Sequence, residues 1–267
     1  MERIEGGCRT RGIPVPNSDG PILSVVTIVY NRLEDLKITL PNVLAQSYES
    51  IEYIIVDGAS TDGCREYIQE HDERIAYWVS EPDKGLYDAM NKGLSLAKGD
   101  YVWFMNSGDE IFESDTCQKM VDGLIGDPDV IFGETMMIDE ARKEVGLRSE
   151  ITTQRLPEEL HWKSLERGMV VCHQSILVRT SIAEPYILNH PFSADIDWVI
   201  KALKKSKGNH NAHQILSRYL MGGFSKKNHR KSLLDRFEIL KSHYGLIPTL
   251  WNHLWIVLRA MFSSPKY

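Results

Sequence analysis

Cysteine, positive charge and long apolar runs are all scarce in this sequence of 267 residues. The four cysteines are far apart and form no Cys-x-x-Cys pair, so the sequence predicts free thiols in a reducing compartment and argues against a zinc site or a disulfide framework. A formal net charge of −6 gives no reason to expect binding to nucleic acid. No uninterrupted apolar run reaches about 18 residues, so no membrane-spanning helix is expected.

Several motifs that would define a familiar site are also missing. No Gly-x-Gly-x-x-Gly follows the first predicted strand, and the P-loop pattern does not occur. His-Glu-x-x-His and Gly-x-Ser-x-Gly are absent too. A glycine-loop dinucleotide site, a P-loop, a zinc protease and a nucleophile-elbow hydrolase are therefore not expected.

What is present is a regular alternation of apolar strands and amphipathic helices over the first half of the chain. Four apolar runs predict buried strands, at residues 23–30, 51–56, 75–79 and 101–105. The segments between them have helical spacing of their apolar residues. This alternation predicts an α/β fold with right-handed crossovers and a parallel sheet that is covered on both faces.

The second half is less regular, and it predicts a mixture of short elements. Strands are expected at 129–138 and 144–150, which could pair as a hairpin, and at 173–178 and 218–224; helices are expected at 114–124, 195–203, 231–244 and 246–262. Residues 1–21 are polar, rich in Gly and Pro, and lack the apolar core of a signal peptide, so they are expected to form a mobile tail. We expect one catalytic domain over 22–225 and a helical extension over 226–267.

Polar residues follow each of the first four predicted strands. The four segments are Tyr30–Arg32, Asp57–Gly63, Glu81–Gly85 and Asn106–Asp109. The carboxyl ends of parallel strands share one edge of a sheet, where open α/β proteins bind ligands. One such strand end is usually only a turn, but four together favour a site. Acids beside an amide and a hydroxyl suit a divalent cation that bridges phosphates, and the glycines allow close approach of the backbone. The sequence thus predicts a nucleotide-diphosphate site built from acids.

Five segments carry a resemblance to a known family: "SVVTIVYNR", "IEYIIVDGASTDG", "EPDKGLYDAMNKGLSLAKGDYVWFMNSGD", "HQSILVR" and "ADIDWVIKAL". They resemble the family 2 glycosyltransferases of the GT-A fold, and especially the small bacterial enzymes of capsule, exopolysaccharide and O-antigen synthesis, including the colanic-acid type. The likeness is dense over residues 23–112, thinner over 172–203 and weak beyond. It implies a Rossmann-like, mostly parallel sheet flanked by helices, with a helical C-terminal extension.

The resemblance also implies roles for residues that match the family's motifs. Tyr30 and Asn31 would lie beside the nucleotide base and ribose, and Asp57 would recognise the base, normally a uracil. Positions near the diphosphate and the donor sugar are matched by Lys84, Gly85, Asn91, Asn106 and Ser107.

The segment Asn106–Asp109 takes the place of the family's Asp-x-Asp metal motif, but Asn106 and Gly108 stand where the strict motif has acids. Asp109 is left as the implied ligand of a divalent cation, Mn²⁺ or Mg²⁺. The departure leaves open a protein that binds nucleotide sugars without catalysis. A metal-dependent nucleotidyltransferase, which would release pyrophosphate, is a further alternative.

The implied reaction inverts the anomeric centre, and the family places its catalytic base at Asp195. Asp197 is the main competitor, and an ordinary helix N-cap is the alternative reading of Asp195. The base would remove a proton from the attacking acceptor hydroxyl, while the cation neutralises charge on the leaving diphosphate. His173 and Ser175 would line the acceptor side, although a buried, hydrogen-bonded histidine is an equal alternative.

Processive members of the family carry Gln-x-x-Arg-Trp and several membrane helices, and this sequence has neither. It therefore predicts the addition of one sugar per encounter, to a hydroxyl of a glycan or a lipid-linked acceptor, in the cytoplasm. A basic stretch at 226–231 precedes an amphipathic segment at 246–262 that carries two tryptophans. This segment is expected either to dock peripherally on an anionic membrane or to pack on the catalytic domain or in a homodimer.

Overall fold

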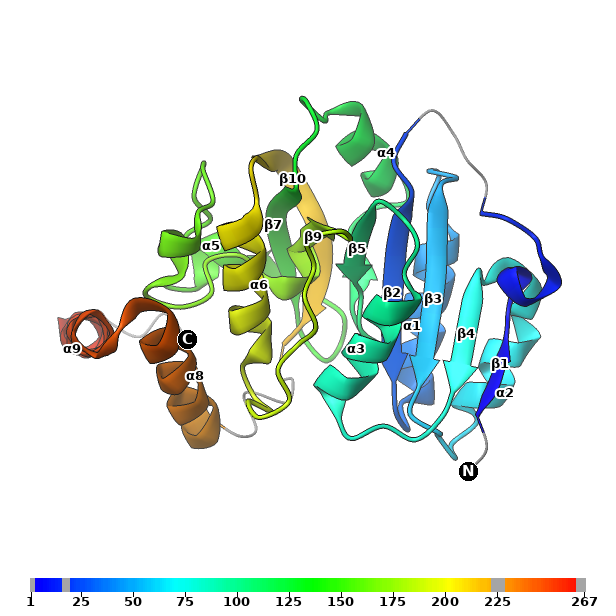
Figure 1. Cartoon of the computed structure of the whole chain (residues 1–267), viewed down its shortest axis with the longest axis horizontal. Coiled ribbons are helices and arrows are strands. Elements are labelled where there is room, and N and C mark those ends of the chain that lie inside the picture. The colour runs from blue at the N-terminus through cyan, green and yellow to red at the C-terminus, as the bar shows by residue number, and fades with distance from the viewer. Residues whose placement is uncertain (1–2, 16–19, 222–228, 263–267) are drawn as a thin grey trace.

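A ten-stranded mixed sheet runs through the molecule in the order β1-β4-β3-β2-β5-β9-β7-β10-β6, with β8 paired to β7 off this path (Figure 1). The computed structural model describes residues 3–15, 20–221 and 229–262. The strands are β1 Ile4–Gly6, β2 Leu23–Val29, β3 Ile51–Asp57, β4 Tyr77–Ser80, β5 Tyr101–Phe104, β6 Glu110–Ile111, β7 Val130–Ile138, β8 Glu144–Leu147, β9 Ile176–Arg179 and β10 Asn209–Leu220. The helices are α1 Leu33–Leu44, α2 Cys64–Glu70, α3 Leu86–Leu96, α4 Thr116–Asp122, α5 Arg148–Ile151, α6 Ala194–Lys205, α8 His229–Tyr244 and α9 Leu246–Phe262.

The first half of the sheet forms as the sequence predicts. Strands β4, β3, β2 and β5 pair in parallel, and α1, α2 and α3 lie in the connections between them. In the second half, β9 is antiparallel to both β5 and β7, β10 is parallel to β7, and β7 and β8 form the expected antiparallel pair. The α/β prediction, with a mostly parallel core flanked by helices, is confirmed.

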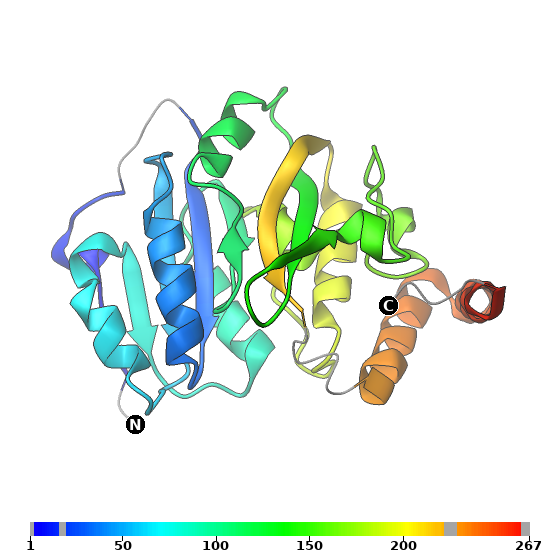
Figure 2. The ribbon, with the colours of Figure 1, turned by 180° about the vertical axis from the view of Figure 1, so that it is seen from behind.

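Successive residues of each strand supply two separate cores, because side chains alternate across a sheet. On β2, Val26 and Ile28 pack with α3 and α6 on one face. Val25 and Val29 pack with α1, α2 and α4 on the other. Figure 1 shows the face that carries α3 and α6, and Figure 2 shows α1 and α2 on the reverse. All the central strands are therefore buried on both sides, which accounts for their continuous apolar character.

The N-terminal segment differs from the expected mobile tail. Residues Ile4–Gly6 form an edge strand that pairs antiparallel with β4, and a 3₁₀ turn follows at Cys8–Arg11. The guanidinium of Arg9 donates to Glu52 Oε1 over 2.9 Å, and Glu52 is only 2% exposed. The segment is ordered because it covers the free edge of β4 and pairs a buried carboxylate, neither of which shows in its polar composition.

Two other boundaries shift from their predicted positions. Residues His173–Ser175 form a 3₁₀ turn, so β9 begins only at Ile176. Strand β10 begins at Asn209, nine residues before the predicted start at 218, because polar residues fill its first half. The last three residues expected in that strand, 222–224, lie outside the described part of the chain.

At the far end of the molecule from β1, α8 packs on α6 and α9 follows after one residue (Figure 1). The side chains that join α8 to the rest include Asp235, which accepts hydrogen bonds from His190 Nδ1 and the backbone of Phe192. All four cysteines are free thiols, as predicted. Among the described residues, no helix combines the length and apolar character that crossing a membrane requires.

Candidate active site

The carboxyl ends of β2, β3, β4 and β5 meet at one edge of the sheet, as parallel pairing requires (Figure 1). Tyr30 follows β2 and is 61% exposed, so its ring is open to a ligand. A Cβ on Gly58 would collide with the carboxylate of Asp83 and lie 3.1 Å from the Tyr30 ring. Three strand ends therefore come together at Gly58, where a larger residue would require the Asp83 side chain to move.

Asn31 and Asp57 hold the loops of this edge together. The backbone of Asn31 is left-handed, with φ 49°; its N–H donates to Ser60 Oγ, and its Oδ1 accepts the N–H of Thr61, both over 2.8 Å. Asp57 is fully buried, and its carboxylate accepts the Ser60 N–H at 3.2 Å and the Ser80 hydroxyl at 2.5 Å. The Asp57 carboxylate thus joins the loop at Ser60 to the end of β4 at Ser80.

The loop before α3 brings Lys84 and Gly85 to the same edge. Gly85 has φ 117°, and its N–H donates to Asp83 Oδ1 over 2.7 Å. The side chain of Lys84 is exposed. Asn91, predicted to lie near the donor, holds the backbone of a neighbouring segment: its Nδ2 donates to the carbonyl of Tyr186 over 2.9 Å, and its Oδ1 accepts the Tyr186 N–H over 2.6 Å.

The loop Asn106–Asp109 follows β5 and is fixed by α1. The hydroxyl of Thr39 donates to the carbonyl of Asp109 over 2.7 Å and accepts the N–H of Gly108 over 2.9 Å. Asp109 is 6% exposed, and its Oδ1 accepts the N–H of Leu220 over 3.1 Å. Burial raises the pKa of Asp109 to about 7, although the Leu220 hydrogen bond and the charge of Arg142 oppose the shift.

This loop offers oxygen donors of the kind a hard cation takes. Asn106 Oδ1 is buried and has no hydrogen-bond partner among the described residues. With the carboxylate of Asp109 it supplies an amide oxygen and a charged oxygen from one loop. Across the described residues no group of three or more His, Cys, Asp or Glu side chains is placed to hold a metal. The amide oxygen of Asn106 and the carboxylate of Asp109 are of the kinds that Mg²⁺ takes as ligands, together with phosphate and water.

Asp195 and Asp197 lie in the first turn of α6, whose N-cap is Ser193, so Asp195 is not the N-cap. Asp195 Oδ1 accepts the Tyr87 hydroxyl at 3.2 Å and the Ile196 N–H at 3.0 Å. Within the described part of the chain, no hydrogen bond reaches its Oδ2.

Asp197 has the opposite surroundings. It is 4% exposed, and its carboxylate contacts His243 Nε2 at 2.7 Å and Lys201 Nζ at 2.8 Å. Burial alone would raise the pKa of Asp197, but the hydrogen bonds from His243 and Lys201 outweigh it and hold the pKa below its usual value. Both oxygens of Asp197 thus contact a nitrogen, Oδ1 that of His243 and Oδ2 that of Lys201 in an ion pair, whereas Asp195 Oδ2 has no such contact among the described residues.

His173 is a buried, hydrogen-bonded histidine in this structure. Its Nε2 lies 2.7 Å from the hydroxyl of Tyr186, and aromatic rings of Phe104 and Trp198 surround it. Burial lowers the pKa of His173. Ser175 is also buried, and its hydroxyl bonds to Thr135 and Ser217.

Two residues at this edge escaped the sequence analysis, Asp83 and Tyr87. Asp83 lies in one of the predicted strand ends but was assigned no role, and Tyr87 lies in a segment that was predicted only to be helical. The hydroxyl of Tyr87, close to the turn at Gly85, was the feature that could have indicated a role. Its partner Asp195 is far away in the sequence.

Comparison with known proteins agrees with this geometry. Residues 24–185, more than half of the chain, match Glycosyl transferase family 2. An uncharacterized glycosyltransferase of Mycobacterium tuberculosis is 35% identical over 193 residues, covering 69% of this chain and 70% of the relative. The putative teichuronic acid biosynthesis glycosyltransferase TuaG of Bacillus subtilis is 38% identical over 108 residues, or 39% of this chain and 42% of the relative.

Solved structures share the fold at low sequence identity. The S. aureus TarS fragment 1–349 in complex with UDP-GlcNAc superposes with a TM-score of 0.62 and 16% identity; the match covers 81% of this chain and 64% of that fragment. The mannosyltransferase PcManGT from Pyrobaculum calidifontis, in complex with GDP-Man and Mn²⁺, gives a TM-score of 0.59 with 16% identity, covering 93% of this chain and 77% of its own. The fold is GT-A, and the chain belongs to the family 2 glycosyltransferases.

Proposed function

We propose that the protein is an inverting, non-processive glycosyltransferase that moves one sugar from a nucleotide-diphosphate sugar to an acceptor hydroxyl. The observation that carries this proposal is the carboxylate of Asp195, which lies at the start of α6 with Oδ1 hydrogen-bonded and Oδ2 unbonded within the described residues. A carboxylate with one available oxygen can accept the proton of an attacking hydroxyl.

The proposed step is a single displacement. The acceptor oxygen bonds to C1 of the donor sugar, the bond from C1 to the diphosphate oxygen breaks, and the nucleoside diphosphate leaves with the electron pair. Asp195 receives the acceptor's proton. Asp197 cannot easily act as a second carboxylate, because His243 and Lys201 occupy its oxygens. One available carboxylate supports inversion, since it serves as a base and needs no covalent intermediate.

The residues proposed to hold the cation are Asn106 and Asp109, with Ser107 beside them. A divalent cation, Mn²⁺ or Mg²⁺, would supply positive charge against the developing charge of the leaving diphosphate. The buried, unpartnered Asn106 Oδ1 supports this proposal, and the PcManGT structure contains Mn²⁺. Lys84 and the turn at Gly85 are proposed to approach the diphosphate and the donor sugar.

For the donor we propose a uridine nucleotide. Tyr30 and Asn31 would lie against the base and ribose, and Asp57 would contribute to the choice of base by fixing the Ser60 loop from below. The structural neighbours bind UDP-GlcNAc in one case and GDP-Man in the other, so the fold admits both bases. A site whose buried polar groups match one base rejects the other strongly.

The acceptor is proposed to be a glycan or a lipid-linked sugar in the synthesis of a surface polysaccharide. TuaG is named for teichuronic acid biosynthesis, and relatives in Mycobacterium that are 27% identical over 231 residues are named for PGL/p-HBAD biosynthesis. Both names concern a glycan or a glycolipid, which supports an acceptor of this class.

A donor panel tests the function. Purified protein is mixed with UDP- and GDP-sugars, with and without Mn²⁺ or Mg²⁺, and release of nucleoside diphosphate is scored with water as the acceptor. We expect slow, metal-dependent release from a UDP-sugar. In a parallel reaction with UTP and a sugar 1-phosphate, release of pyrophosphate would point instead to a nucleotidyltransferase. Tight donor binding without any release would point to a binding protein, and equal release from UDP- and GDP-sugars would contradict the uridine preference.

A further inference from the structure

Asp195 is held by a residue from a different helix, Tyr87 of α3. The Tyr87 hydroxyl donates to Asp195 Oδ1, the same oxygen that accepts the Ile196 N–H. The 3.2 Å distance is long for an O–H···O hydrogen bond, as contacts in catalytic sites often are before substrate binds. Because both hydrogen bonds are made to Oδ1, they fix the orientation of the carboxylate plane and therefore the direction of Oδ2.

We propose that Tyr87 is a positioning residue that sets the orientation of the Asp195 carboxylate. This inference rests on the proposed function, in which Asp195 takes the acceptor's proton. Tyr87 is the second residue of α3, directly after the Lys84–Gly85 turn. Through its hydrogen bond, Tyr87 therefore links the turn at Lys84 and Gly85 to the carboxylate of Asp195.

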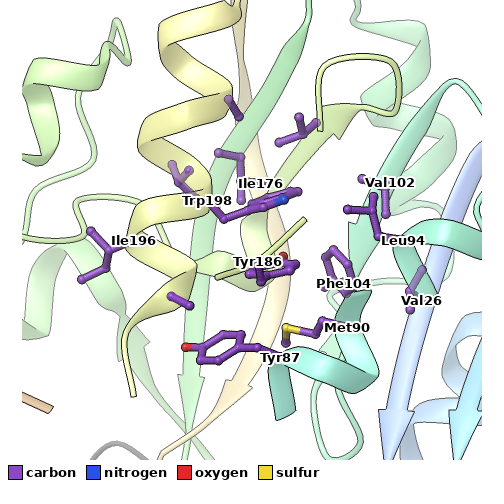
Figure 3. Packing of buried hydrophobic residues seen from close by; sticks show 14 of the residues in the cluster. Val26, Tyr87, Met90, Leu94, Val102, Phe104, Ile176, Tyr186, Ile196 and Trp198 are labelled. Carbon is purple, nitrogen blue, oxygen red and sulfur yellow. The ribbon is translucent and has the colours of Figure 1, made fainter. Parts of the chain in front are cut away.

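The ring of Tyr87 is itself fixed by a column of aromatic side chains. It stacks on Tyr186, with centroids 5.5 Å apart and planes at 22°, and Tyr186 stacks on Trp198 at 5.0 Å and 11°. Figure 3 shows Tyr87, Tyr186 and Trp198 one above another between α3 and α6. Trp198 lies one turn after Asp195 on α6, so the column begins and ends on the two helices that carry the pair.

The middle of the column is anchored from three directions. The amide of Asn91 clamps both backbone groups of Tyr186, and the Tyr186 hydroxyl bonds to His173. Phe104 meets Tyr186 edge-on at 5.4 Å. With its stacking partner held this way, the Tyr87 hydroxyl cannot move far from Asp195 Oδ1.

The chemistry of Tyr87 suits a permanent hydrogen-bond donor. The side chain is 6% exposed. Burial, and next the negative charge of Asp195, raise its pKa well above the ordinary value for tyrosine. The hydroxyl therefore keeps its proton at any working pH, donates to the carboxylate and does not compete with it as a base.

A double-mutant cycle separates positioning from a merely structural role. Turnover and KM are measured as nucleoside diphosphate release from the best nucleotide sugar of the donor panel, with water as acceptor, for Tyr87→Phe, Asp195→Asn and the double variant. The matched control is Tyr53→Phe. Tyr53 is also buried, and its hydroxyl donates over 3.1 Å to Thr27, but on the opposite face of the sheet.

We expect Tyr87→Phe to lower kcat about tenfold, the effect of one lost hydrogen bond, with donor KM nearly unchanged. Asp195→Asn should lower kcat by roughly 10²-fold or more. In the double variant the Tyr87 change should have no further effect, because it acts through Asp195. Tyr53→Phe should keep full turnover.

The outcomes distinguish the positioning role of Tyr87 from the role of Asp195 as the base. If Asp195→Asn loses turnover but Tyr87→Phe keeps it, or if the two losses multiply in the double variant, the positioning role is overturned and the base stands. A fully active Asp195→Asn overturns the base assignment and the positioning role together. A loss of turnover in Tyr53→Phe that equals the loss in Tyr87→Phe would show a general effect of removing a buried hydroxyl, and it would also overturn the positioning role.

Discussion

Asp195 and Asp197 lie on the same turn of α6, yet their partners give them different chemistry. Asp197 is paired with His243 of α8 and with Lys201, whereas Asp195 touches only a tyrosine hydroxyl and a backbone N–H among the described residues. The sequence could place both acids at the start of a helix. The family resemblance favoured Asp195, but the helix pattern alone could not choose between them, because His243 lies 46 residues beyond Asp197 and its contact is a product of the fold.

Asp197→Asn should weaken the fold and spare turnover. Removing one member of a buried ion pair costs up to about 3–5 kcal/mol, and the amide keeps part of the hydrogen bonding, so we expect a loss of roughly 2–4 kcal/mol in the free energy of unfolding. This loss in the free energy of unfolding is measured by urea denaturation at neutral pH. Glu184→Gln is the control, because its pairs with Lys201 and Lys205 are solvent-exposed and contribute little.

The loss should depend on pH in a defined direction. The pKa of Asp197 is lowered in the folded state, so its stabilisation is present above the unfolded value, near 4, and disappears as pH falls through the folded value. Variant and native protein should therefore converge in stability below about pH 4. Unchanged stability at neutral pH, or lost turnover in a stable variant, would contradict the assignment.

Asp109→Asn should have the reverse effect on stability. Burial raises the pKa of Asp109 to about 7, so without a cation the ionised carboxylate is a cost to the fold. The folded state holds the proton more tightly than the unfolded state, so native stability falls as pH rises from about 4 to about 7. Above pH 7 the variant should melt about 2–4 °C higher for each kcal/mol gained, and it should lose metal-dependent donor binding.

Thermal melts at pH 5 and pH 8 without metal, and UDP titrations with Mn²⁺, provide the measurement. Asp115→Asn serves as the control, because Asp115 is largely exposed and paired with Lys119. A variant that binds UDP with the native dependence on Mn²⁺ would remove Asp109 from the cation site.

At the scale of elements, α3 and α1 use asparagine in the same way. Asn91 clamps the backbone of Tyr186, and Asn42 of α1 clamps Ile111 of β6 with bonds of 3.0 and 2.8 Å. Each amide satisfies a backbone N–H and a backbone C=O that would otherwise be left unpaired. The Asn91 clamp fixes the segment that leads to Asp195, the candidate catalytic base. The Asn42 clamp fixes the strand that follows the candidate cation loop, Asn106–Asp109.

Asn91→Ala is expected to lower stability and leave donor KM unchanged. The change strips two partners from the Tyr186 backbone, at about 1–3 kcal/mol for each buried group that stays unpaired. Asn42→Ala, the matched clamp, should lose a similar amount. Melting temperature and donor KM are measured together. A raised donor KM with an unchanged melting temperature would return Asn91 to the donor-binding role that the resemblance implies.

The strands and helices differ in how well they could be predicted from the sequence. Strands β2 to β5 and helices α1 to α3 could be located because buried parallel strands are continuously apolar and helix faces are periodic. Strand β1 could not, since three residues on a sheet edge carry no periodicity and their partner β4 is about 70 residues away. The first half of β10 was missed because its half-buried positions are filled by Asn, His and Gln. The strand ends of the site were identified, whereas Tyr87 and the clamp role of Asn91 depend on long-range contacts.

At the scale of the whole molecule, α9 presents an apolar surface at the end opposite β1 (Figure 1). Its exposed side chains, at positions that share one helical face, are Leu246, Ile247, Leu250, Trp251 and Leu254. Trp255 and the rest of the helix to Phe262 have no described side chains, and residues 226–228 of the basic stretch lie outside the described part. Docking on an anionic membrane stays our prediction, with packing in a homodimer as the alternative.

Flotation with anionic and with neutral vesicles tests the docking. At low salt the intact protein should float with anionic vesicles only, because interfacial tryptophan and basic side chains act together. Trp251→Glu should abolish flotation. Ile125→Glu, a change at an equally exposed side chain outside α8 and α9, should not. Protein that stays unbound, and that dissociates or aggregates when residues 246–267 are removed, would make the surface a structural interface.

The position of β10 has a consequence for biosynthesis. Strand β6 pairs with β10 through Ile111 and Ser217, and the N–H of Leu220 at the end of β10 binds the carboxylate of Asp109. A nascent chain that stops before β10 already contains strands β2 to β5, but it lacks the Leu220 N–H that binds this carboxylate. Pairings that distant in sequence form late and slowly. The proposed cation site should therefore be completed late in synthesis, and we expect the chain to gain metal-dependent affinity for its donor only after β10 has been made.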